Sequence, residues 1–210
     1  MYKVGLTGNI GSGKTWIAGI FERLGIGVFN ADLEAKKLYG YEDVIREIVT
    51  LCGRQILTDK LEIDRRKLAQ LAFSNHKILA SLNQIIHPRV RGMFSGFAAS
   101  RPHSAYVIYE SALIFETGYY RRLDATIVVS AQQEIRKKRV MQRDKADEHF
   151  FVERNAHQLP ESEKVKLGNF VICNDGHQLV LPQVVAVNDQ ILRLIIEYQK
   201  NGRNDTTGNR

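Results

Sequence analysis

Apolar positions follow two different spacings along this chain. Short runs that are almost continuously apolar alternate with longer stretches in which apolar residues recur at helical spacing. The short runs predict β-strands at 3–7, 27–30, 105–110, 125–130 and 169–173. Continuous apolar character is typical of parallel strands that helices cover on both faces. The pattern therefore predicts an α/β fold, a doubly wound five-stranded parallel sheet.

Two gaps between the expected strands are too long for simple crossovers. The first, 31–101, is nearly all helical in pattern and predicts a helical insertion, within which Pro88 is expected to end a helix. The second, 143–167, is densely charged and predicts a mobile lid. A polar, glycine-containing end at 201–210 is expected to be a disordered tail. The remaining ranges form the expected core: 1–30, 102–142 and 168–200.

One octapeptide between the first strand and the first helix carries a specific chemical signal. Residues 8–15 read GNIGSGKT and match the phosphate-binding P-loop pattern G-x-x-x-x-G-K-[ST]. Its context fits, because a strand precedes it and an apolar helical face follows, comprising Trp16, Ile17, Ile20, Phe21 and Leu24. A glycine-rich turn without a ligand is the alternative. The pattern predicts that nucleotide phosphates contact Asn9, Ile10, Gly11, Ser12, Gly13, Lys14 and Thr15, with the Thr15 hydroxyl on Mg²⁺.

Composition narrows the setting without identifying a ligand. The chain has 210 residues and 44% hydrophobic content, enough for one globular domain with insertions. No apolar run approaches a membrane span, so we expect a cytoplasmic protein. Cys52 and Cys173 form no C-x-x-C, which argues against disulfides and structural zinc. The net charge of +7 suits nucleic acid, an anionic membrane or a phosphorylated metabolite, although the basic run 136–139 is expected to be partly a solvated helix face.

Switches, motors and kinases all share a P-loop, so other residues must discriminate among them. The N-K-x-D segment of a guanine-specific switch is absent, and no oligonucleotide-binding module is visible. A small-molecule kinase fits best, because a helical insertion can bind an acceptor and a lid can exclude water. Asp32 follows the second expected strand, at the carboxyl edge of the sheet where ligands bind. It is a candidate catalytic base, with helix N-capping as the alternative.

Seven segments, in order and spacing, carry a closer resemblance. They read VGLTGNIGSGKT, NADLEAKKLY, LNQIIHPRVR, ESALIFE, RVMQRD, ERNAHQLPESEK and FVICNDG. Over roughly residues 1 to 200 the chain resembles the dephospho-CoA kinase family. The resemblance implies a fold of the P-loop kinase type and ATP-dependent phosphorylation of the ribose 3′-hydroxyl of dephospho-CoA, the last step of coenzyme A synthesis.

The resemblance also implies roles for individual residues. Asp32 matches the family's catalytic aspartate, Lys14 and Thr15 its phosphate and Mg²⁺ residues, and Arg139 its arginine near the transferred phosphoryl group. Ordinary surface arginines at i, i+4 spacing are the alternative for Arg139 and Arg143. Further expected ATP contacts are Arg143, Asn174 and Asp175, although an Asn-Asp-Gly turn would explain the last two equally. Expected acceptor contacts are Thr7, Asp32, His87, Pro88, Arg89, Gln158 and Lys164.

Four positions depart from the family pattern. Asn30 stands where the family more often has an aspartate, and it cannot act as a base. Glu110 replaces an aspartate, and the sequence leaves undecided whether it contacts Mg²⁺ through a water molecule. Gly168 and Asn169 replace a common Ala-Asp pair. The expected partners are ATP and dephospho-CoA, with Mg²⁺, without nucleic acid or membrane, in a monomer or weak homo-oligomer. The alternatives are another small-molecule P-loop kinase, for a nucleoside or nucleotide, and a nucleic-acid-binding ATPase.

Overall fold

The computed structural model describes residues 1–204, and the chain divides into two compact units. The first unit combines Met1–Phe29 with Arg101–Arg210, and the second is Asn30–Ser100. The second unit covers most of the stretch that the sequence marks as a helical insertion. Each unit has its own buried apolar residues.

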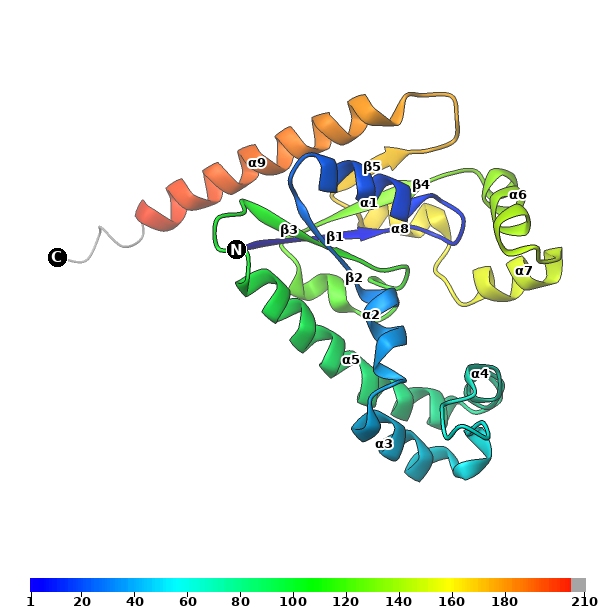
Figure 1. Ribbon diagram of the computed structural model, residues 1–210. Coiled ribbons are helices and arrows are strands. Elements are labelled where there is room, and N and C mark those ends of the chain that lie inside the picture. Colours follow the sequence, from blue (N-terminus) through cyan, green and yellow to red (C-terminus); the bar gives the residue numbers. More distant parts are fainter. Residues whose placement is uncertain (205–210) are drawn as a thin grey trace. The chain divides into compact units, whose positions relative to one another are not determined.

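A five-stranded sheet forms the centre of the first unit (Figure 1). Its strands are β1 (Tyr2–Thr7), β2 (Gly27–Asn30), β3 (Tyr106–Glu110), β4 (Ala125–Ser130) and β5 (Phe170–Cys173). Their order is β2-β3-β1-β4-β5, and β1 pairs in parallel with both β3 and β4. The predicted parallel sheet is confirmed. The segment that follows β1 therefore begins at the carboxyl edge of the sheet, between β3 and β4, where ligands bind in open α/β sheets.

Helices cover both faces of this sheet. On one face, α1 (Lys14–Arg23) and α9 (Val180–Asn204) pack on the apolar side chains of β1, β3, β4 and β5. On the other face, α8 (Glu161–Leu167) packs against β4. The connections also contain η2 (Tyr119–Arg122), α6 (Gln133–Asp144) and α7 (Glu148–Ala156). No helix within residues 1–204 is long and apolar enough to cross a membrane.

The end of the chain differs in part from the expected tail. Helix α9 continues to Asn204, so residues 201–204 of the expected disordered segment are helical. The apolar residues of α9 that face the sheet, Val184, Val187, Ile191 and Ile195, recur at helical spacing and fix the first part of the helix on the sheet. The rest of the expected tail, residues 205–210, lies outside the described residues.

The second unit is helical. Its elements are α2 (Ala31–Leu38), α3 (Glu42–Cys52), η1 (Arg54–Ile56), α4 (Arg65–Ser74) and α5 (His76–Ala99). Helices α2, α3 and α4 each pack against α5. Asp64 and Asn75 cap α4 and α5, and their side-chain oxygens accept hydrogen bonds from first-turn N–H groups.

The prediction that Pro88 ends a helix is wrong. Pro88 lies inside α5, which continues to Ala99. Proline removes one backbone hydrogen bond, but the buried stripe of α5 continues through it with a spacing of four residues, at Leu82, Ile86, Val90, Phe94 and Ala98. Burial of that stripe against the neighbouring helices therefore outweighs the local preference.

Candidate active site

The P-loop, residues 8–15, connects β1 to α1, and two of its glycines are required by close contacts. Gly11 has φ +80°, and a Cβ there would lie 2.4 Å from the carbonyl oxygen of Arg136. Gly13 has φ +93°, and a Cβ there would lie 2.3 Å from Asn174 Nδ2. A side chain at either position would clash as well as strain the backbone. The loop is therefore packed tightly against α6 and the end of β5.

Side chains hold the carbonyl groups of the P-loop. Lys14 Nζ donates to Gly8 O over 2.8 Å, and Asn174 Nδ2 donates to Ser12 O over 2.8 Å. Arg139 Nη1 makes longer contacts with Gly11 O at 3.4 Å and Ser12 O at 3.5 Å. In a trans peptide the carbonyl and the next N–H point in opposite directions. Fixing these carbonyls therefore fixes the direction of the N–H groups that would face an anion.

A cavity of about 530 Å³ opens beside the P-loop. Its lining residues are Gly11, Gly13, Lys14, Thr15, Trp16, Arg139, Gln142 and Arg143. The N-terminus of α1 lies at the same place, so its dipole adds to the positive charge of the lysine and the two arginines. Arg143 also pairs with Asp144 at 2.8 Å, which raises the pKa of its guanidinium. The cavity has the charge that a polyphosphate requires.

Trp16 differs from its expected place on the buried face of α1. Its side chain is 58% exposed and lines the cavity, whereas Ile17, Ile20 and Phe21 are buried as expected. The sequence already contained a sign of this, because an aromatic side chain directly after the P-loop threonine can turn toward a ligand. Trp16 is the only tryptophan of the chain, so its fluorescence is a probe of this cavity without background from other tryptophans.

An oxygen pair lies at the edge of the P-loop. Thr15 Oγ1 donates to Glu110 Oε1 over 2.9 Å, and Glu110, the last residue of β3, is only 4% exposed. Hydroxyl and carboxylate oxygens are ligands that Mg²⁺ accepts in nucleotide sites. Within residues 1–204 no cluster of three or more His, Cys, Asp or Glu could hold a metal by itself. The pair therefore fits a metal that binds together with phosphate.

Three expected acceptor contacts belong to the first unit. Thr7 is fully buried at the end of β1, and its Oγ1 has no hydrogen-bond partner among residues 1–204. Gln158 Oε1 accepts from the N–H of Ile10 over 2.8 Å. Lys164 is fully buried, with its ammonium 2.8 Å from both Ala112 O and Glu116 Oε1. Gln158 and Lys164 thus anchor this part of the expected lid to the P-loop and to the segment that follows β3.

Replacing Lys164 with methionine is expected to cost about 3–5 kcal/mol of folding free energy, because Glu116, whose side chain is only 15% exposed, would lose its ion-pair partner. Urea denaturation measures this loss. Lys166→Met is the matched control, since Lys166 forms an exposed ion pair with Glu163 on the same helix, and such pairs contribute about 0–1 kcal/mol. Equal stability losses in the two variants would contradict a structural role for the buried pair.

The other expected acceptor contacts, Asp32, His87, Pro88 and Arg89, belong to the second unit. Asp32 is exposed in the first turn of α2. The cap of that helix is Asn30, whose Oδ1 accepts from the N–H of Leu33 over 2.8 Å. Asn30, and not Asp32, is therefore the N-cap of α2.

His87 and Arg89 lie two residues apart in α5, on nearly opposite sides of the helix, with different surroundings. Burial, with a smaller effect of Arg91, lowers the pKa of the half-buried His87 and favours its neutral form. Arg89 Nη2 contacts Glu47 Oε1 at 2.5 Å and Asp43 Oδ2 at 3.2 Å, which raises its pKa. Arg89 thus joins α5 to α3 within the second unit, and Pro88 between them is exposed.

The Asn-Asp-Gly segment after β5 combines a turn with a P-loop contact. Asp175 Oδ1 accepts from the N–H of His177 over 2.9 Å, and Gly176 has φ +88°, as a turn requires. Asn174 instead points its amide at Ser12 O and is largely buried. The site also includes Gln142 and, behind the P-loop, Arg136, which the sequence did not single out. No local motif marks either residue, because each depends on how α6 packs.

Comparisons with known proteins agree with this geometry. The family model described as dephospho-CoA kinase matches residues 2–179. A Leptospira interrogans dephospho-CoA kinase is 36% identical over 178 residues, covering 84% of this chain and 86% of that protein. A Thermus thermophilus crystal structure superposes with a TM-score of 0.82 at 33% identity, covering 90% of this chain and 97% of that one.

A solved dephospho-CoA kinase from Campylobacter jejuni has a TM-score of 0.64 at 26% identity, with 91% of this chain and 97% of that chain covered. In each case the likeness extends over the sheet, the P-loop and the helical unit, because nearly the whole of both chains is included. The chain belongs to the dephospho-CoA kinase family.

Proposed function

We propose that the protein transfers the γ-phosphoryl group of ATP to the ribose 3′-hydroxyl of dephospho-CoA, giving coenzyme A and ADP. The observation that carries this proposal is the cationic cavity at the P-loop in a chain of this family. The cavity accounts for the donor, and family membership accounts for the acceptor. Phosphoryl transfer needs little covalent chemistry from the protein, so positioning and charge neutralisation are its main tasks.

The donor side rests on residues of the first unit. Lys14 would leave Gly8 O to contact the β- and γ-phosphates, and P-loop N–H groups would bind their oxygens. Arg139 and Arg143 line the cavity and would stabilise the charge that spreads over the transferred group. Thr15 and Glu110 would hold Mg²⁺, whose contribution when bound is to neutralise charge on the phosphate oxygens. Asn174 would support the loop through its hydrogen bond to Ser12 O.

The acceptor side rests on Asp32 and the second unit. An exposed carboxylate in the first turn of α2, a helix that Asn30 caps, suits a group that orients a hydroxyl and accepts its proton. His87 is held neutral by burial and would donate or accept a hydrogen bond without adding charge. Arg89 would act mainly by fixing α5 on α3. We place this chemistry in the cytoplasm.

Acceptor profiling tests the proposal. Purified protein with Mg-ATP is offered dephospho-CoA, adenosine, AMP and CMP, and ADP formation is followed by a coupled assay. We expect turnover with dephospho-CoA to exceed turnover with every other acceptor by at least about 10³-fold, since a site that binds a whole acceptor discriminates strongly against fragments. Faster turnover with a nucleoside or a nucleoside monophosphate would contradict the proposed acceptor.

A further inference from the structure

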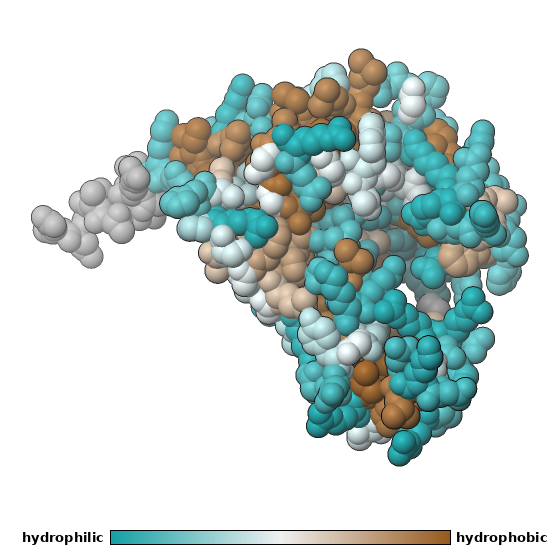
Figure 2. All heavy atoms as spheres, viewed as in Figure 1, coloured by the Kyte–Doolittle hydropathy of each residue, from teal (hydrophilic) through white to brown (hydrophobic). Residues whose placement is uncertain are grey.

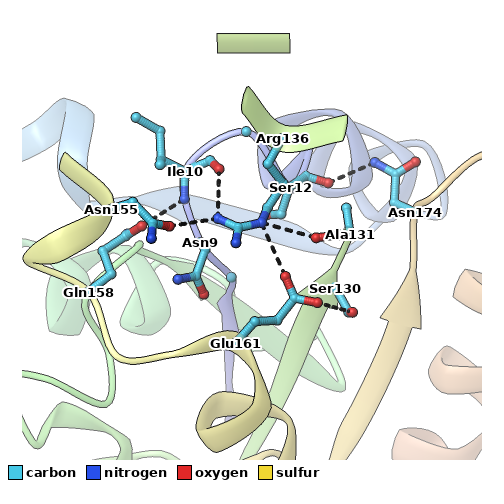
Figure 3. A network of polar contacts seen from close by, with 12 residues as sticks. Asn9, Ile10, Ser12, Ser130, Ala131, Arg136, Asn155, Gln158, Glu161 and Asn174 are labelled. Atoms are coloured by element: carbon cyan, nitrogen blue, oxygen red, sulfur yellow. Dashed lines mark hydrogen bonds and ion pairs between the residues drawn. The ribbon is translucent and has the colours of Figure 1, made fainter. Parts of the chain in front are cut away.

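A charged side chain is buried directly behind the P-loop. Arg136, in the first turn of α6, is only 3% exposed, although the surface over α6 and α7 is mostly hydrophilic (Figure 2). Figure 3 shows its guanidinium at the centre of a polar network that joins the P-loop to α6, α7 and α8. The run 136–139 was expected to be partly a solvated helix face, and its first residue is not part of such a face.

Four polar groups surround this guanidinium. Nη1 donates to Asn155 Oδ1 of α7 over 2.8 Å, and it lies 3.5 Å from Ile10 O of the P-loop. Nε donates to Ala131 O over 3.0 Å and lies 3.2 Å from Glu161 Oε2 of α8. The contacts come from residues far apart in the sequence, so one side chain connects three helices with the loop (Figure 3).

The P-loop residue that Arg136 contacts is held from two sides. The carbonyl of Ile10 faces Arg136, while its N–H donates to Gln158 Oε1 over 2.8 Å. The preceding residue is held as well, because Asn9 Nδ2 donates to Leu159 O over 3.0 Å. The backbone of Arg136 itself touches Gly11, where no side chain would fit. The segment around residues 155–161 and α6 thus form the back wall of the P-loop.

This arrangement determines the direction of one N–H group. The carbonyl of Ile10 and the N–H of Gly11 belong to the same trans peptide, so they point in opposite directions. Holding the carbonyl toward Arg136 turns the Gly11 N–H away from α6, and Gly11 lines the cavity. Arg136 is not among the residues that line the cavity, so the influence of its side chain on a ligand would pass through this peptide.

Burying an arginine costs desolvation free energy, which packing alone would not require. Burial lowers the pKa of Arg136, with Glu161 opposing the shift, so the charge is disfavoured where it lies. An apolar side chain of similar volume could fill the same space beside Phe151, whose ring lies 5.8 Å from the guanidinium. A charged group is needed only if the orientation of its acceptors matters.

We propose that Arg136 is a positioning residue for the nucleotide: it fixes the Ile10–Gly11 peptide for a phosphate oxygen and makes ATP affinity depend on its contact with Asn155 of α7. This inference rests on nucleotide binding at the P-loop, which is part of the proposed function, and is independent of the acceptor. The chemical group recognised is the phosphate chain, and the assigned effect is on the binding of ATP rather than on the binding of dephospho-CoA.

Calorimetry with the magnesium complex of the β,γ-imido analogue of ATP tests the proposal without an acceptor. Arg136→Met should weaken binding by about 10–100-fold, the worth of a hydrogen bond to a charged group, with the KM for dephospho-CoA changed by less than about 3-fold. Lys137→Met is the matched control, because Lys137 also joins α6 to α7 through Glu148, but on the surface. It should bind the analogue within about twofold of the unmodified protein.

A second variant keeps the test decisive if Arg136→Met fails to fold. Asn155→Leu leaves the arginine in place but removes the acceptor that orients it, and should weaken analogue binding by about 3–10-fold. In the double variant the effects should not add, since both act through one contact. Unchanged analogue affinity in folded variants, additive effects, or equal losses for both substrates would overturn the proposal. Loss of dephospho-CoA turnover in the unmodified protein would count against the proposed acceptor alone.

Discussion

Replacing Asp32 with asparagine is expected to lower kcat about 10²–10⁴-fold, the range that general acid–base groups contribute. Asparagine has nearly the same size but cannot accept the proton of a hydroxyl. The cap of α2 belongs to Asn30, so the change leaves the helix start intact and the variant should fold normally. Steady-state kinetics with both substrates, together with circular dichroism, measure these effects.

The control for Asp32 lies on the same helix. Glu34 is a second carboxylate in the first turn of α2, paired with Lys37, and Glu34→Gln should keep kcat within about threefold of the unmodified enzyme. ATP affinity should be nearly unchanged in both variants, because the proposed phosphate contacts are made by P-loop residues and by arginines of α6 rather than by α2. Near-normal turnover of Asp32→Asn would remove Asp32 from the proposed mechanism.

Replacing Lys14 with methionine is expected to reduce both nucleotide binding and rate. Loss of a positioned donor for developing charge typically costs about 10²–10³-fold in kcat, and loss of a charged phosphate contact weakens binding by at least about tenfold. Binding can be followed through Trp16, which lines the same cavity and is the only tryptophan. We expect ATP to change its fluorescence in the unmodified protein at concentrations where the variant shows no change.

Lys138 provides the comparison for this change. It is an exposed lysine of α6 in the same unit, outside the residues that line the cavity, so Lys138→Met removes one positive charge from the protein without touching the site. Its ATP titration should match the unmodified protein within about twofold. If the two methionine variants bound ATP alike, Lys14 would act only through net charge.

The sequence predicted those features that short stretches of chain determine. The strands could be located because buried parallel strands are continuously apolar, and the P-loop because glycine positions, Lys14 and Thr15 lie within eight consecutive residues. The end of α5 was missed because proline has a local cost, whereas the packing of Leu82 through Ala98 on neighbouring helices is not local. Local rules therefore fail where the free energy gained by burying side chains exceeds the cost of one unfavourable backbone residue.

In the site, too, the residues in local motifs were predicted and those placed by tertiary packing were not. Arg139 and Arg143 were predicted from a resemblance in sequence, and both line the cavity. Arg136, three residues before Arg139, has its partners in α7 and α8, 19 and 25 positions further along. Its burial depends on how those helices fold back on α6, which no spacing rule expresses. Lys164 is a similar case. It lies in a charged segment, so the sequence predicts an exposed side chain, and only the fold brings Glu116 close to it.

The measurement that tests the central claim most directly is the fate of the γ-phosphate. The protein is incubated with dephospho-CoA, magnesium and ATP labelled at the γ-phosphate, and the product is analysed by mass spectrometry and by phosphorus NMR. The account predicts one labelled phosphate per acceptor, located on the ribose 3′-hydroxyl, with ADP formed in equal amount. Label released only as inorganic phosphate, or attached to another position or acceptor, would contradict it.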